Sequence, residues 1–400
     1  MRRRPQIRSK PSILFGSGPQ RADAMPGDKS IGLVLSGGGS RAAYQAGALR
    51  ALLPYLQDRS QPISVIIGSS IGAINGLITG ACLKHGLGSA VEQLHELWIE
   101  RTYRNTFANS PSKAFLRAIK VAATQYLAPG PHASAESIFD PSPLVSRVDQ
   151  VLKDNGGLLP ENRHSQLKAV GVMTTLEGQK RSPLLFISTR DQISSEIMAG
   201  ATFQVRYHDD LQAKHGFASA ALPSVLPPVE LDDQGNKMRL VDGGISQNVP
   251  VDPAVRLGAH RVLVIDISGR SWWLDRYGEE HDTRPTWEVP AELETFCMRP
   301  PETLVIKNQE PFGPLLKEAV GSSTSKFISA VGPVWPLFTL LRKKLGEDIA
   351  YETMSYVALD KDYIQGLLER GFNETNKLLR HKVELEFIQS PNYKQWAKAL

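Results

Sequence analysis

The stretches Ile31–Arg41 (IGLVLSGGGSR) and Ile63–Gly72 (ISVIIGSSIG) follow the same plan. Each starts with a short apolar run, as a buried strand does, and continues through a glycine turn into a helical pattern. Strands that alternate with helices form a mainly parallel sheet, because a parallel connection needs a long crossover that is usually a helix. We therefore predict an α/β fold of three layers, α/β/α, around a mainly parallel central sheet.

Outside these two stretches, the same criteria predict further strands and helices. The run Val262–Ile265 is apolar throughout, which is typical of a strand covered on both faces. Residues 270–345 mix tryptophan, proline and charge with little periodicity, so their secondary structure is hard to predict. The strands are expected at Leu167–Met173, Leu184–Ser188, Met238–Val241 and Arg261–Ile267, and the helices near residues 43–56, 74–81, 89–101 and 364–378.

The formal charge of the chain is concentrated at its start. The net charge is +5, from 46 Lys and Arg against 41 Asp and Glu, and residues 1–10 hold five bases and no acid. Residues 11–400 are therefore formally neutral, which argues against a nucleic-acid-binding core. Residues 1–28 are rich in Pro, Gly, Ser and Arg. We expect them to form a disordered basic leader that either stays solvated or touches anionic lipid.

The cysteine count and the hydropathy limit the setting in which the protein works. Cys82 and Cys297 are too few for a disulfide framework, which favours a reducing, cytoplasmic compartment. No stretch is apolar over the length that spans a bilayer, and the basic start is not followed by the apolar region of a secretory signal. Any membrane contact is therefore expected to be peripheral.

Ser70 lies in the pattern Gly68-Ser69-Ser70-Ile71-Gly72, between an apolar run and a helical stretch. A serine at a sharp strand-to-helix turn projects its hydroxyl from the fold, and Gly68 and Gly72 remove the Cβ atoms that would clash there. The pattern alone is short enough to occur by chance. Its position between strand and helix favours a nucleophile, so we predict that Ser70 attacks a carbonyl carbon.

The glycine run Gly37–Gly39 is the second chemical feature. The backbone amides of Gly38 and Gly39 can hold the oxyanion of a tetrahedral intermediate, an effect of about 3 kcal/mol per donor in other enzymes. A helix that begins near Arg41 would add its positive end. A phosphate-binding loop is the alternative. However, the run lacks the Gly-Lys-Ser/Thr ending of a P-loop, and Ala42 stands where a dinucleotide fold has its third glycine.

A serine nucleophile needs a base, and two kinds of candidate are present. Asp242 follows Leu240 and Val241 and precedes two glycines. We therefore expect its carboxylate at the C-terminal end of a strand, where open α/β sheets gather their ligand sites. An aspartate in a hairpin turn has the same local pattern. The histidines His260 and His281 also follow the serine, as in an α/β-hydrolase, although neither lies in a recognisable motif.

Three motifs together resemble those of the patatin-like phospholipases, and they occur in that family's order. The likeness spans about residues 31–267, and it includes the Leu-Pro-rich segment 218–229 that precedes the aspartate. Ala42 is a departure, because the family usually carries glycine at that position. The motifs are the oxyanion segment Gly37, Gly38, Gly39, Ser40 and Arg41, the nucleophile turn with Gly68, Ser70 and Gly72, and the aspartate motif Asp242, Gly243 and Gly244, followed by Asn248 and Pro250.

The resemblance implies a lipid acyl hydrolase of the phospholipase or lysophospholipase type, whose substrate is a phospholipid or another lipid ester. It implies a catalytic dyad of Ser70 and Asp242, with no histidine and with an acyl-serine intermediate. It also implies a patatin-like catalytic domain over residues 29–270, and we expect residues 271–400 to form a helical extension that packs on the core. No cofactor is expected, and no metal, because no cluster of acids and histidines has ligand-like spacing.

Three alternative functions stay open. The first is a carboxylesterase of the α/β-hydrolase type with a Ser-His-Asp triad, in which a histidine such as His260 would be indispensable. The second is a nucleotide-binding protein that uses the glycine loop. The third is a non-catalytic module that binds lipid, in which replacing Ser70 would change nothing measurable.

Arg41 and two amphipathic segments also have two interpretations each. Arg41 could contact an anionic head group or fix the glycine turn through a buried ion pair, and we favour the ion pair. Residues 111–128 place Lys113 and Arg117 on one helical face and apolar side chains on another. That segment could be an interfacial helix or lid, although an ordinary surface helix is favoured. Val331–Leu345 is a second candidate, but Pro333 and Pro336 are expected to break it.

Overall fold

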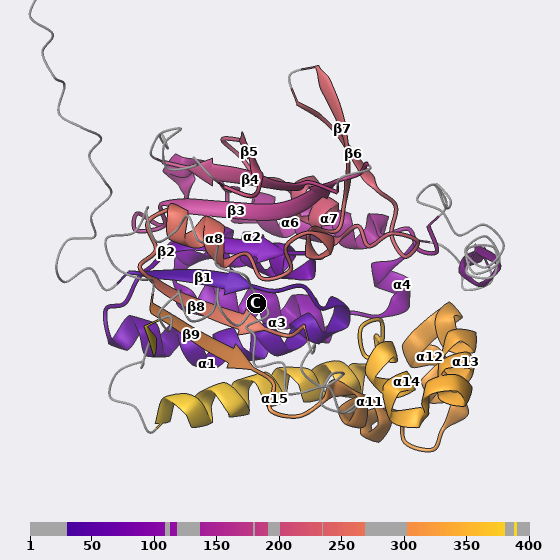
Figure 1. Ribbon diagram of the computed structural model, residues 1–400. Helices are drawn as coiled ribbons and strands as arrows, with labels where there is room; N and C mark the ends of the chain where they lie inside the picture. Colours follow the sequence, from indigo (N-terminus) through magenta and orange to yellow (C-terminus); the bar gives the residue numbers. More distant parts are fainter. Residues whose placement is uncertain are drawn as a thin grey trace, which may run out of the picture.

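The structure is a computed structural model of the chain, and it describes residues 30–108, 113–117, 137–178, 181–190, 201–233, 235–268, 302–380 and 388–389. Figure 1 shows a central sheet with helices on both sides and a group of C-terminal helices at one end of it. The predicted leader at residues 1–28, most of the segment 111–128, and the histidine at position 281 lie outside the described residues.

The central sheet is mainly parallel, as predicted. Its strand order is β10-β9-β8-β1-β2-β3-β4-β5, and a hairpin of β6 and β7 joins it through β3. Strands β9, β8, β1, β2 and β3 run parallel to one another, whereas β10 runs antiparallel to β9, and β4 and β7 run antiparallel to β3. The strands are β1 Ile31–Leu35, β2 Ile63–Ser69, β3 Ala169–Leu176, β4 Pro183–Thr189, β5 Gln204–Tyr207, β6 Val229–Asp233, β7 Asn236–Val241, β8 Arg261–Asp266, β9 Glu302–Lys307 and β10 Ile388–Gln389.

The central strands are buried on both faces, which explains their uninterrupted apolar sequences. On β1, Leu33 and Leu35 join the larger of two core clusters, whereas Val34 joins the smaller one. This alternation follows from the two-residue period of a strand. The larger cluster also contains residues of α1, α2, α3, α6, α7 and α15, and the smaller one contains residues of α8. The three-layer α/β/α fold is therefore confirmed, with unequal helical layers.

The helices behind the sheet and at its end have the following bounds. They are α1 Ala43–Asp58, α2 Ile71–Cys82, α3 Leu87–Ile99, α4 Tyr103–Thr106, α6 Ser142–Asp154, α7 Ala213–Ala220, α8 Val251–Arg256, α11 Phe312–Val320, α12 Thr324–Val331, α13 Trp335–Leu345, α14 Glu347–Met354 and α15 Lys361–Arg380. Short 3₁₀ turns precede α1 as η1 Gly39–Ala42 and follow β7 as η4 Gly243–Ile245. No helix of the described ranges combines the length and the apolar character that crossing a membrane requires.

Each strand and helix predicted from the sequence has a counterpart within a few residues of its expected ends. The predicted strands correspond to β3, β4, β7 and β8, and the predicted helices to α1, α2, α3 and α15. The helix α15 packs along α1, where Gly47 and Gly371 allow close approach. A Cβ atom on Gly371 would lie 2.1 Å from the carbonyl oxygen of Tyr44.

The structure places elements in residues 270–345, which were hard to interpret from the sequence. Strand β9 and the helices α11, α12 and α13 lie within this range. The segment Val331–Leu345 is not one helix, because α12 ends at Val331 and α13 begins at Trp335, but only one of the two prolines lies at this break. Pro336 lies in the first turn of α13, and Pro333 lies in the 3₁₀ turn before it. A proline is tolerated there because the first-turn amides of a helix have no intrahelical partner to lose.

Candidate active site

Ser70 lies at a sharp turn between β2 and α2. Its backbone angles are φ 53° and ψ −134°, a conformation that a residue with a side chain seldom adopts. A Cβ atom on Gly68 would lie 2.4 Å from the Cα of Ala73, and one on Gly72 would lie 2.5 Å from the carbonyl oxygen of Leu35. The turn therefore requires glycine at both positions that the sequence pattern indicated, and it holds Ser70 between strand and helix.

The Asp242 side chain meets the Ser70 side chain. Ser70 Oγ donates a hydrogen bond of 2.6 Å to Asp242 Oδ2, across 172 positions of sequence. Strands β2 and β3 are parallel, and Ser69 lies opposite Met173. The strand β7 runs antiparallel to β3, with Val241 opposite Thr175, so the last residues of β7 lie beside the C-terminal end of β3. Asp242 directly follows the last residue of β7, as expected, and it lies at the C-terminal edge of the parallel strands although β7 is antiparallel to β3.

Several hydrogen bonds fix the orientation of the aspartate. The Gly244 amide donates to Asp242 Oδ1 at 2.7 Å, and this leaves Oδ2 for the serine. The Asp242 amide donates to the Ala221 carbonyl oxygen at 3.0 Å, and the Thr175 hydroxyl donates to the Asp242 carbonyl oxygen at 2.8 Å. The two oxygens of the carboxylate are therefore aimed at different donors, and only one of them is the Ser70 hydroxyl.

Burial changes the acid–base behaviour of Asp242. The residue is 5% exposed, and desolvation raises the pKa of its carboxyl group to about 6. The hydrogen bonds from Ser70 and the Gly244 amide favour the charged form and partly offset this rise. A carboxylate with a pKa near 6 is a stronger base than an ordinary aspartate and is still ionised at neutral pH.

The glycine segment lies directly against the nucleophile. A Cβ atom on Gly37 would lie 2.7 Å from Ser70 Cβ. The amides of this segment are not equally available, because the Gly37 amide donates to Asn248 Oδ1 at 3.2 Å and the Ser40 amide donates to the Tyr356 carbonyl oxygen at 2.8 Å. Within the part of the chain that the structure describes, the amides of Gly38 and Gly39 have no acceptor.

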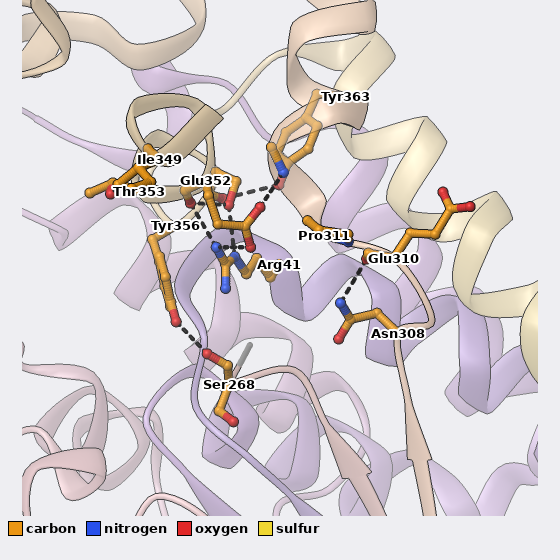
Figure 2. Close-up of polar contacts among 12 residues, drawn as sticks. Arg41, Ser268, Asn308, Glu310, Pro311, Ile349, Glu352, Thr353, Tyr356 and Tyr363 are labelled. Carbon is orange, nitrogen blue, oxygen red and sulfur yellow. Dashed lines mark hydrogen bonds and ion pairs between the residues drawn. The ribbon is translucent and has the colours of Figure 1, made fainter. Parts of the chain in front are cut away.

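Arg41 points toward Glu352 and Tyr356 of the C-terminal region (Figure 2). It is fully buried, and its Nη2 lies 2.7 Å from Glu352 Oε1, while its Nε donates to Ser355 Oγ at 2.7 Å. Its guanidinium carbon lies 3.6 Å from the ring centre of Tyr356. The structure thus shows the buried ion pair that we favoured for Arg41 over a contact with a head group.

Two polar residues support the site without having been assigned a role from the sequence. Ser219 Oγ accepts a hydrogen bond of 2.7 Å from the Ser70 amide, and its hydroxyl donates to the Met173 carbonyl oxygen. The Asn248 side chain accepts from the Gly37 amide and so connects the segment after Asp242 to the glycine loop. Asn248 stood in the aspartate motif, and Ser219, which lies on α7, stood in the segment 218–229 of the family likeness.

The described histidines do not join this site. His260 immediately precedes β8, and the register places Ile265 and Gly68 at the same level, each opposite Leu35. His260 therefore lies at the opposite end of the strand, on the order of 15 Å from the edge that carries Ser70. His208 and His215 contact each other and Phe186, and neither is a partner of Ser70 or Asp242.

The fold and the site together define an α/β protein in which a serine at a strand–helix turn faces an aspartate. Residues 33–255 match the family model of the patatin-like phospholipases, and the chain therefore belongs to that family. The family predicted from the three motifs is thereby confirmed.

Curated relatives share only part of their length with this chain. Patatin-like phospholipase domain-containing protein 7 from Mus musculus is 26% identical over 259 residues, which cover 61% of this chain and 15% of that protein. Lysophospholipase nte1 from Aspergillus terreus is 46% identical over 50 residues, or 12% of this chain and 3% of that protein. This chain thus spans less than a sixth of either relative.

The solved structures that align with this chain are only distantly similar to it. Human GIVD cytosolic phospholipase A2 aligns with 90% of this chain and 64% of its own, with a TM-score of 0.39 and 11% identity. VipD from Legionella pneumophila aligns with 88% of this chain and 67% of its own, with a TM-score of 0.36 and 14% identity. Likenesses of this size carry no argument about function.

Proposed function

We propose that the protein is a serine acyl hydrolase that cleaves the carboxylic ester bonds of phospholipids or lysophospholipids. The observation that carries this proposal is the hydrogen bond of 2.6 Å between Ser70 Oγ and Asp242 Oδ2, beside two amides that have no acceptor among the described residues. Membership of the patatin-like phospholipase family supports lipid hydrolysis as the reaction.

In the first half-reaction, Asp242 accepts the hydroxyl proton as Ser70 Oγ bonds to the ester carbonyl carbon. The carbonyl oxygen gains the negative charge, and the amides of Gly38 and Gly39 donate hydrogen bonds to it. The amino-terminal end of α2, which begins next to Ser70, adds a favourable field. Collapse of the intermediate breaks the ester bond, and the alcohol leaves with the proton that Asp242 had taken.

In the second half-reaction, water replaces the alcohol. Asp242 accepts a proton from the water, whose oxygen bonds to the acyl carbon. The same two amides hold the second oxyanion. Its collapse releases the fatty acid and returns the proton to Ser70, so the enzyme ends in its starting state.

A dyad without histidine requires a carboxylate of unusual basicity. Burial supplies it, because the pKa of Asp242 is raised to about 6. An acyl chain in the site would exclude more water and strengthen both the Ser70–Asp242 hydrogen bond and the oxyanion contacts. A cytoplasmic location with peripheral membrane contact stays a prediction. The division into a catalytic domain at 29–270 and an extension at 271–400 also stays a prediction.

The proposal is tested by comparing four proteins on a short chromogenic ester: the wild type, Ser70→Ala, Asp242→Asn and His260→Ala. We expect Ser70→Ala to lose at least about a thousandfold in kcat/KM, and Asp242→Asn about a hundredfold or more. His260→Ala is expected to retain wild-type activity. An organophosphonate should label the wild type and fail to label Ser70→Ala.

The results also separate the alternatives. Loss of activity in His260→Ala would point to a triad and contradict the dyad. Equal activity in all four proteins would exclude the hypothesis that the protein is an enzyme. Thermal stabilisation by nucleotide, without labelling by the organophosphonate, would instead favour a nucleotide-binding protein.

A further inference from the structure

Exposed apolar side chains gather on α12 and α13. Of the eight large apolar side chains that are exposed among the described residues, five lie on these two helices. Their exposed fractions run from 37% for Ile328 to 49% for Leu340. A concentration of this kind marks a surface that docks on something, whereas scattered single residues do not. The α12–α13 surface consists of Ile328, Trp335, Leu337, Leu340 and Leu345.

The charged residues of α12 and α13 themselves are all basic. Residues 321–345 contain four bases, Lys326, Arg342, Lys343 and Lys344, and no acid. Lys326 pairs with Asp362 and Arg342 with Glu347, but Lys343 and Lys344 are exposed and form no ion pair with another described residue. The body of the chain is formally neutral, so a local excess of bases beside exposed leucines is a distinct feature. It complements an anionic surface.

The distribution of side chains along α13 matches a bilayer interface. Trp335 stands at its start, Leu337 and Leu340 follow one turn apart, and the basic residues occupy its last turn. Tryptophan favours the head-group level of a membrane, leucine favours the acyl boundary, and lysine reaches phosphate groups. A protein partner would more often show a buried aromatic anchor and few lysines.

The α12–α13 surface lies at the same end of the molecule as the proposed active site. The Ser40 amide, next to the glycine loop, donates to the Tyr356 carbonyl oxygen, and Arg41 pairs with Glu352 on α14. The Tyr103 hydroxyl donates to the Val331 carbonyl oxygen at the end of α12, which fixes that helix to the rest of the chain. In Figure 1, α12 and α13 form the outer part of this helical group, on its side away from the sheet.

We propose that the α12–α13 surface docks the protein on a bilayer that contains anionic phospholipid. Leu337, Leu340 and the other apolar residues of the surface enter the interface, and Lys343 and Lys344 contact lipid phosphates. The proposal deepens the proposed function, since it places the nucleophile end of the molecule against its lipid substrate. It differs from the contact predicted for residues 111–128, of which the structure describes only 113–117.

The test measures vesicle binding apart from catalysis. Binding is measured by co-sedimentation in the Ser70→Ala background, with vesicles of phosphatidylcholine alone or mixed with phosphatidylglycerol. The variants are Leu337→Gln/Leu340→Gln and Lys343→Gln/Lys344→Gln. Matched controls are Tyr207→Gln, which removes an exposed apolar residue of β5, and Lys168→Gln/Lys237→Gln, which removes two exposed lysines elsewhere.

We expect the parent protein to prefer the anionic vesicles. The leucine pair should lower binding to them by about tenfold or more, since each leucine side chain contributes to partitioning. The lysine pair should lower binding to anionic vesicles by about tenfold and leave binding to phosphatidylcholine unchanged. Both controls should bind like the parent. On a soluble short ester, with Ser70 intact, all four variants should keep wild-type activity.

Three outcomes would overturn the docking proposal. The first is that the parent protein shows no preference for anionic vesicles. The second is that both α12–α13 variants bind vesicles as well as the parent does. The third is that the protein is a dimer, and that Leu337→Gln/Leu340→Gln dissociates the dimer while vesicle binding stays intact. The last result would assign the surface to a second copy of the chain. A failure of the proposed function is distinguished by a different measurement. In that case Ser70→Ala and the wild type would show the same activity on the soluble ester.

Discussion

The carboxyl group of Asp242 gains its basicity from burial, and this has a measurable consequence for the pH dependence of activity. Only the ionised form can accept the Ser70 proton, and the pKa is raised to about 6. We expect kcat/KM on a short ester to be level above about pH 7 and to fall tenfold per pH unit below about pH 6. A pH–rate profile on an uncharged ester checks this. Activity that stays level down to about pH 4.5 would contradict a base with a raised pKa.

The same burial means that ionisation of Asp242 lowers the free energy of unfolding. Its pKa is about 6 in the folded protein and about 3.8 as a free side chain, so the folded state binds the proton more tightly. The contribution of the Asp242 carboxyl group to the free energy of unfolding is fully present below pH 3.8 and is lost as the pH rises through 6. Asp242→Asn, which is neutral at every pH, should therefore raise the free energy of unfolding by roughly 1–3 kcal/mol at pH 8.

Urea unfolding of both proteins at two pH values measures this effect. The difference between Asp242→Asn and the wild type should shrink as the pH falls below 6 and disappear near pH 3.8. The asparagine oxygen can still accept from the Gly244 amide, and its NH2 group can then donate to Ser70 Oγ, so both hydrogen-bonded contacts can be kept while the charge is removed. A variant that is less stable than the wild type at pH 8 would contradict the argument.

The 3₁₀ turn η1 is held by a helix more than three hundred positions away. Arg41 is buried without contact to water, and Glu352 on α14 is its ionic partner at 2.7 Å. Glu352 also accepts a hydrogen bond from the Gly313 amide at the start of α11. This connection joins the glycine segment Gly37–Arg41 to two C-terminal helices, so the loop should lose its shape when one partner is removed.

Breaking this ion pair should be costly. Arg41→Met leaves Glu352 buried without its partner and should lower the free energy of unfolding by about 3–5 kcal/mol. The exposed pair of Arg239 and Glu177 is the control, and Arg239→Met should cost less than about 1 kcal/mol. Both are measured by chemical denaturation. The double variant Arg41→Met/Glu352→Leu should recover most of the loss, and a double variant no better than Arg41→Met would contradict the reason given.

Over the whole molecule, the C-terminal helices and the sheet share one core. Residues of α1, α11, α14 and α15 belong to the same hydrophobic cluster as β1 and β8. The helices α1 and α15 approach so closely that a Cβ atom on Gly371 would meet the Tyr44 carbonyl oxygen at 2.1 Å. We therefore expect the two parts to unfold together rather than as separate domains.

Gly371→Ala tests this coupling. The added methyl group forces α15 away from α1 and should destabilise the protein by about 1–3 kcal/mol. Ester activity and far-UV circular dichroism should be lost at the same, lowered temperature. The control is Gly88→Ala on α3, where a Cβ atom has no neighbour within 4 Å, so stability should be unchanged or slightly raised. Activity that survives the loss of α15 structure would show that the parts are independent.

The parts of the fold that followed from the sequence are those with strong local patterns. The runs at β1, β2 and β8 are apolar because both of their faces are covered, and glycines at positions 68 and 72 are required by a turn only a few residues long. The helices α11, α12 and α14 were not predicted because they are short, with eight or nine residues each. Tertiary packing, rather than their own periodicity, stabilises such helices.

The sequence alone determined the strands, the glycine turns and which serine and aspartate were the candidates, because strand and helix periods and turn sterics act over a few neighbouring residues. Tertiary structure alone decided that Ser70 and Asp242 touch across 172 positions, since β7 enters the sheet edge against β3. It also decided that Arg41 pairs with Glu352 across 311 positions, and that burial raises the pKa of Asp242. Contacts and desolvation of this kind depend on how distant segments pack, and no local pattern encodes them.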